Sequence, residues 1–170
     1  MVTRVPVGMI EDFSIDFEAL EDAIEDLEII VADKQDNLGL TGIADASDFI
    51  GGASGTDVLT PAGVFDAAGF VSLTDAATIA VDLSTGFNFT VTLAGDRELG
   101  TPSNPKPGQC GVIEILQDST GTRLLTFAAG WVFADGEAPE LSTDADARDL
   151  LSYFVLPGGI VYASLIKGVR

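Results

Sequence analysis

The sequence predicts a mainly β protein with an N-terminal α-helix, organised as a coiled coil followed by a β-sandwich (jelly-roll-like) knob. Three observations lead to this fold class. Apolar residues recur every three or four positions over residues 13–38, apolar and polar residues alternate in short runs between residues 78 and 166, and the last two runs are apolar on both sides. A strand that is apolar on both faces must be covered on both, by a second sheet, by another subunit, or by both.

The N-terminal repeat predicts a helix whose apolar stripe joins several copies of the chain. With Phe17 at heptad position a and Leu20 at position d, β-branched residues follow at a and leucine at d, a core that favours two strands. Position g holds Ala23 and Ile30, which widen the stripe and permit more than two helices. Ser14 is the predicted N-cap. A single amphipathic helix that folds against its own domain remains the alternative. The predicted oligomer interface consists of Phe13, Phe17, Leu20, Ile24, Leu27, Ile30, Val31 and Leu38.

The segments on either side of this helix have different compositions. Residues 1–12 are short, apolar and broken by Pro6 and Gly8, which indicates either a frayed terminus or an anchor that docks into a groove of another protein. Residues 39–72 are rich in Gly, Ala, Ser, Thr and Asp, and are predicted to form a neck with a short helical turn near residues 44–49. The side chains that the anchor would bury are Val5, Val7, Met9 and Ile10.

Residues 73–170 carry the predicted knob. The strongest hairpin signal joins residues 150–156 to residues 160–166 through Pro157-Gly158-Gly159. Trp131 is a predicted core anchor. Two further hairpins are expected, and the remaining short runs are placed at an edge or in the middle of the sheet pair. The hairpins join residues 111–116 to 123–128 and residues 78–83 to 88–93, the edge run is residues 96–99, and the middle runs are residues 129–135 and 138–143.

Composition excludes several classes of function. The net charge of −19 disfavours nucleic acids and anionic membranes as partners, because like charges repel. The single cysteine, Cys110, permits no intrachain disulfide, and we expect it to be a small strand residue. No apolar run approaches the length of a membrane span and no signal-peptide core is present, so we expect a soluble protein that matures in a reducing cytosol.

The sequence offers no recognisable catalytic motif. It contains no histidine, the commonest general base and metal ligand, and it lacks both the G-x-x-x-x-G-K and the G-x-S-x-G patterns. The acidic run at residues 142–149 lacks the glycine and the distal glutamate of an EF-hand, and is interpreted as a solvated turn. We therefore expect no enzymatic activity, no catalytic residue, no cofactor and no metal site.

Two stretches resemble parts of bacteriophage fibre proteins. Residues 55–64 (G-T-D-V-L-T-P-A-G-V) are similar to a T-D-x-x-V-T-P-A-G-L element that recurs in tail-fibre shafts, although Leu59 stands at the usual valine. Residues 107–168 resemble a small C-terminal β-domain found at the ends of phage fibres and spikes. The features shared with that domain are Gly108-Gln109, Gln117-Asp118, Gly121, Leu125-Thr126-Phe127, Trp131, Leu141-Ser142, Ala147 and residues 149–152.

This resemblance implies a homotrimeric phage virion fibre or spike protein. Its N-terminus would be held by another virion protein, and its C-terminal knob would contribute to attachment to a host-surface glycan or protein. The chain would be made in the host cytoplasm and end up in the virion. The alternative is a purely structural capsid or tail decoration protein without an essential receptor. The resemblance supplies no catalytic residue.

Overall fold

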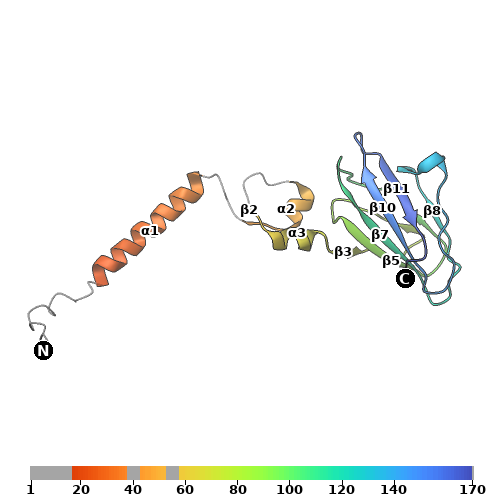
Figure 1. Cartoon of the computed structure of the whole chain (residues 1–170), viewed down its shortest axis with the longest axis horizontal. Coiled ribbons are helices and arrows are strands. Elements are labelled where there is room, and N and C mark those ends of the chain that lie inside the picture. The colour runs from red at the N-terminus through yellow and green to blue at the C-terminus, as the bar shows by residue number, and fades with distance from the viewer. Residues whose placement is uncertain (1–16, 38–42, 53–57, 170) are drawn as a thin grey trace, which may run out of the picture. The chain divides into compact units, whose positions relative to one another are not determined.

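The computed structural model describes residues 17–37, 43–52 and 58–169, and these residues form a mainly β protein with three helices and several sheets (Figure 1). The chain divides into two compact units, Met1–Gly42 and Ile43–Arg170. Each unit is described by itself. The prediction of a mainly β fold with an N-terminal helix is confirmed at this level.

The first unit contains helix α1, Phe17–Asn37. It lies inside the predicted helical range of residues 13–38. Several predicted positions fall outside the described residues: the N-cap Ser14, the interface residues Phe13 and Leu38, and all of the anchor segment, residues 1–12. In the part of the chain that the structure describes, no helix combines the length and the apolar character needed to cross a membrane.

Two short helices open the second unit. Helix α2 spans Ala46–Gly51, and Asp45 caps it by accepting a hydrogen bond from the Asp48 backbone N–H at 3.0 Å, with the reciprocal bond completing a capping box. Helix α3 spans Pro61–Ala67, with Thr60 as N-cap and proline at the first position. The helices are accompanied by two paired parallel strands, β1 (Ile43–Ala44) and β2 (Val58–Leu59).

A six-stranded sheet forms the larger β layer, in the order β3-β5-β7-β10-β11-β9. Strands β10 and β11 pair antiparallel, so the hairpin predicted around Pro157-Gly158-Gly159 is confirmed. Strand β5 pairs parallel with β7, which places segments from the two halves of this unit side by side (Figure 1). The strands are β3 (Phe70–Ser72), β5 (Asn88–Leu93), β7 (Cys110–Gln117), β10 (Arg148–Val155), β11 (Val161–Ile166) and β9 (Trp131–Val132).

A second sheet has three parallel strands in the order β4-β6-β8, namely Thr78–Ile79, Arg97–Leu99 and Leu125–Phe127. This arrangement overturns three predictions. Strands β7 and β8 lie in different sheets and form no hairpin, and the same holds for β4 and β5. Strand β6 is the middle strand of its sheet, whereas the sequence placed it at an edge.

The predicted hairpin between β7 and β8 fails because Gln117, at the end of β7, stabilises a departure from the sheet. Its side-chain oxygen accepts from the Arg123 backbone N–H at 2.9 Å, and its amide donates to the carbonyl oxygens of Arg123 and Ser142, both at 2.9 Å. The two bonds to Arg123 satisfy backbone groups that the predicted hairpin ladder would otherwise pair, whereas Ser142 lies outside that hairpin. The chain can therefore leave the first sheet and enter the second.

The segment around Trp131 is also arranged differently from the prediction. Strand β9 contains only two residues and lies at the edge of the six-stranded sheet, and residues 138–143 form no strand. After β9, a 3₁₀ turn at Ala134–Gly136 includes Asp135 with φ of 57°, which turns the backbone away from extended geometry. Trp131 is nevertheless buried, and its indole N–H donates to the Gly100 carbonyl at 2.8 Å. Its predicted role as a core anchor is confirmed.

One hydrophobic cluster includes side chains from both of these sheets. Phe89, Ile113 and Leu151 come from the six-stranded sheet, and Ile79 and Leu99 from the three-stranded sheet. All five are fully buried. Each such side chain contributes about 1.5–3 kcal/mol through removal from water, so this shared cluster stabilises the second unit.

Candidate functional site: exposed apolar surfaces and a loop pocket

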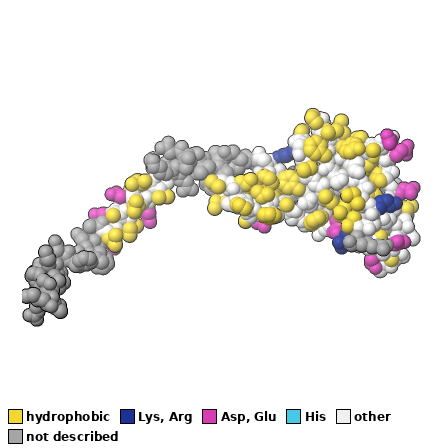
Figure 2. Space-filling view, viewed as in Figure 1, with side chains coloured by type: hydrophobic (Ala, Val, Ile, Leu, Met, Phe, Trp, Pro, Cys, Tyr) yellow, Lys and Arg dark blue, Asp and Glu magenta, His cyan; other side chains and the backbone are white. Residues whose placement is uncertain are grey.

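The predicted stripe on α1 is exposed in the single chain. Leu20, Ile24, Leu27, Ile30 and Val31 each expose 49–62% of their surface. Apolar and acidic side chains both reach the surface of this helix (Figure 2). Such a stripe is chemically competent to pack against another apolar surface. Phe17, another predicted interface residue, is the first residue of this helix.

The sequence prediction left out one exposed apolar residue of α1. Ile29 is 62% exposed, yet it occupies heptad position f, on the side of the helix opposite the predicted seam. The periodicity could not assign it to an interface, because it breaks the repeat.

A second apolar surface lies on the β10–β11 hairpin. Leu151, Tyr153 and Val155 alternate along β10 and point into the core. On the other side, Phe154 remains 45% exposed and its cross-strand partner Tyr162 remains 40% exposed. The predicted two-sided apolar character is present, and the described residues cover only one of the two faces. Figure 2 shows hydrophobic side chains gathered on the visible surface of this unit.

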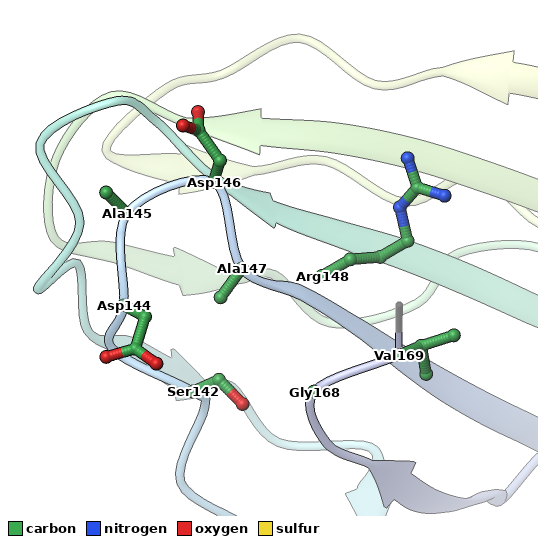
Figure 3. Close-up of a pocket in the computed structure, with 8 residues that line it drawn as sticks. All are labelled: Ser142, Asp144, Ala145, Asp146, Ala147, Arg148, Gly168 and Val169. Atoms are coloured by element: carbon green, nitrogen blue, oxygen red, sulfur yellow. The ribbon is translucent and has the colours of Figure 1, made fainter.

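A small pocket of about 120 Å³ lies beside the acidic loop that precedes β10 (Figure 3). Its walls are the loop from Ser142 to Arg148 and the chain at Gly168 and Val169. The side chains of Asp144 and Asp146 point to opposite sides of the loop, so their carboxylates do not converge on one point (Figure 3).

Asp149 holds the two walls of this pocket together. It is 2% exposed, and its carboxylate accepts three hydrogen bonds: from the Ser142 backbone N–H at 2.6 Å, from the Ser142 hydroxyl at 2.8 Å and from the Gly168 backbone N–H at 2.7 Å. The sequence showed Asp149 only as one acid in an acidic run. Its contacts assign it a structural role, which is to join the loop before β10 to the segment after β11.

Two ion pairs organise the loops near the three-stranded sheet. Asp118 pairs with Arg123, and Asp75 pairs with Arg97, each at 2.7 Å. The hydrogen bond from Arg123 holds the pKa of Asp118 below its ordinary value, and the bond from Arg97 does the same for Asp75. Both carboxylates are occupied by their partners, which leaves them poorly suited to proton transfer.

Among the described residues, Tyr153 has the titratable side chain whose pKa is shifted most strongly. Its hydroxyl donates to the Phe87 carbonyl at 2.8 Å, and burial raises the pKa of Tyr153 well above its ordinary range. The phenol is therefore neutral at physiological pH and acts as a hydrogen-bond donor. Within the described ranges, no group of three or more Cys, Asp or Glu side chains is arranged to hold a metal ion.

Comparisons of the chain with protein-family models, with curated proteins and with solved structures each found no match.

Proposed function

We propose that this chain is the subunit of a homotrimeric bacteriophage fibre or spike, held in the virion by its N-terminus and contributing to host attachment through its C-terminal knob. The observation that carries the proposal is the exposed heptad stripe of α1. Its apolar side chains gain burial only when another surface covers them. Two further copies of the same helix supply such a surface in a parallel coiled coil.

The charge distribution of the helix supports this packing. Residues 11–33 contain acids and no Lys or Arg, so helices placed with their acidic sides together would repel. In the proposed coil, the apolar positions a and d face inward, and the e positions, Glu21 and Glu28, lie beside the apolar g residues Ala23 and Ile30. Most carboxylates then remain in water.

The widened stripe favours three helices over two. Because position g is apolar, the buried sector of each helix extends beyond the two-position seam of a dimer. A larger buried sector is satisfied when each helix contacts two neighbours. The resemblance to phage fibres agrees with this number of chains.

The second unit supplies the proposed knob. Its six-stranded and three-stranded sheets share one hydrophobic cluster, which supports a β-sandwich in which each of these sheets covers the inner face of the other. Three knobs on one coil would raise the avidity of a weak contact with a cell surface.

Lysine substitutions on α1 test the assembly. Ile24→Lys places a charge at position a, inside the proposed seam, and we expect it to reduce the molecular mass in solution from three chains to one. Ile29→Lys introduces the same change at the solvent-facing position f and is the matched control, expected to leave the trimer intact. Sedimentation equilibrium measures both. Equal masses for the two variants would mean that α1 is not the joint.

Binding of the full-length trimer to host cells tests the attachment role. Saturable binding that falls when the trimer dissociates supports attachment. A trimer that incorporates into particles and shows no binding at high avidity identifies a decoration protein.

A further inference from the structure

The outer face of the six-stranded sheet carries three rows of paired residues. Directly paired residues in neighbouring strands point to the same side of a sheet. In the first row, Phe154 lies between Cys110 on β7 and Tyr162 on β11, and Tyr162 pairs in turn with Val132 on β9. Val132 is 42% exposed, so this row presents an apolar strip that runs from β7 to the edge strand β9.

The middle row contains two serines, and some of its hydrogen-bonding groups have partners within the chain. Ser152 lies between Val112 and Ser164, and its hydroxyl donates to the Ser164 carbonyl at 3.1 Å. The backbone N–H of Val112 donates to the Asn88 side chain at 3.0 Å. Groups that already have partners lose little when water is removed from the surface.

The third row runs from β5 to β11. Leu150 lies between Glu114 and Ile166, and Ile166 is 57% exposed. Glu114 accepts a hydrogen bond from the Thr90 hydroxyl at 2.8 Å and pairs with Arg148 at 3.0 Å. The negative charge of Glu114 is therefore balanced by the positive charge of Arg148, and these rows carry no net charge.

Charge and hydrogen bonding together indicate what covers this face. Two copies of a chain with a net charge of −19 repel each other unless they meet at surfaces without net charge. A cationic partner would be attracted to the acidic surfaces instead. A glycan is held mainly by hydrogen bonds, and Ser152, Thr90 and Glu114 already use hydrogen-bonding groups within the chain, so these three residues offer it little.

We infer that the outer face of the six-stranded sheet packs against a second copy of this chain in the same oligomer. The inference rests on the proposed assembly through α1 and extends it, because it assigns a second self-association surface within the Ile43–Arg170 unit. The exposed Phe154, Tyr162 and Ile166 form its apolar part.

Cys110 is a built-in probe of this face, because it is an exposed free thiol directly paired with Phe154. In the full-length wild type, we expect its reaction with Ellman's reagent to be about tenfold slower than in the dissociated chain, since reaction requires opening of the interface. The Ile24→Lys chain, or wild type diluted until monomeric, provides the dissociated reference.

Tyr162→Glu tests the face itself, and Leu124→Glu is its matched control, because Leu124 is also apolar and exposed but lies outside the six-stranded sheet. We expect Tyr162→Glu to abolish the protection of Cys110 and Leu124→Glu to preserve it. The rate of the Cys110 reaction in each variant is divided by the rate in the dissociated form of the same variant. This removes any direct effect of the substitution on the reactivity of the thiol. Tyr162→Thr serves as a second variant if the glutamate disturbs folding.

The outcomes separate the two proposals. Protection that Tyr162→Glu removes supports the inference. An oligomer in which Cys110 reacts as fast as in the dissociated chain overturns the inference and leaves the coil intact. A wild type that is monomeric at every concentration overturns both.

Discussion

At the scale of single residues, a few buried polar side chains join segments that are distant in the sequence. Gln117 and Asp149 each bond to backbone groups of loops outside their own strands. Such groups are stabilising only while every partner is present, because a buried N–H without an acceptor is costly.

Asp149→Ala is therefore expected to destabilise the protein by roughly 2–3 kcal/mol, since it leaves the Ser142 and Gly168 N–H groups without their acceptor. Urea unfolding measures the change. Asp144→Ala, in the exposed part of the same loop, is the control and should change stability little. Equal effects of the two substitutions would contradict the structural role of Asp149.

The Asp118–Arg123 pair predicts a pH dependence with a defined sign. The pKa of Asp118 is lower in the folded state than its ordinary value, so its stabilising contribution is present at neutral pH and is lost as pH falls through the folded pKa. We expect the stability difference between wild type and Asp118→Asn to shrink from pH 7 to the acid range, below about pH 4. Chemical denaturation at several pH values measures it, and a difference that grows on acidification would contradict the assignment.

At the scale of elements, close backbone approaches determine how strands and turns fit together. The turn before β5 lies so near β7 that a Cβ atom added at Gly111 would be 1.7 Å from the Phe87 carbonyl oxygen. The Tyr153 hydroxyl binds that same carbonyl. A glycine in the strand is thus required by the neighbouring backbone rather than by its own conformation.

Gly111→Ala is expected to displace the turn at Phe87 from β7 and to destabilise the protein by about 2 kcal/mol or more. Thermal unfolding monitored by circular dichroism gives the comparison. Thr92→Ala, at an exposed strand position, is the control and should have a small effect. An alanine at residue 111 that leaves the melting temperature unchanged would show that the turn can move freely.

At the scale of the whole molecule, the proposed assembly couples stability to association. The apolar stripe of α1 and the outer sheet face are both exposed in one chain, and both would be buried in the trimer. When folding and association are linked, stability rises with protein concentration.

We therefore expect the melting temperature of the wild type to increase with chain concentration, and that of Ile24→Lys to be independent of it. Differential scanning calorimetry measures both melting temperatures over a roughly hundredfold range of chain concentration, which is wide enough for linkage to give a clear shift. Concentration-independent melting of the wild type would contradict the proposed assembly.

Local patterns were sufficient for several features of this protein. The heptad spacing located α1, the Pro157-Gly158-Gly159 turn located the β10–β11 hairpin, and the size of Trp131 indicated its burial. These features depend on residues close together in the chain, whose spacing and turn chemistry are readable directly. The anchor segment and the ends of the predicted stripe lie outside the described residues, and the role of the whole stripe as an oligomer interface stays a prediction.

Apart from the β10–β11 hairpin, the tertiary structure alone decided which strands share a sheet. The parallel pairing of β5 with β7 and the place of β6 between β4 and β8 join segments far apart in sequence, whereas β7 and β8 are close in sequence and lie in different sheets. Gln117, Asp149 and Gly111 also depend on contacts with distant segments, which are made at Ser142, Gly168 and Phe87 respectively. Alternation of apolar residues specifies that a strand has an inner face, but it does not specify the neighbour; packing and hydrogen bonding between distant segments make that choice.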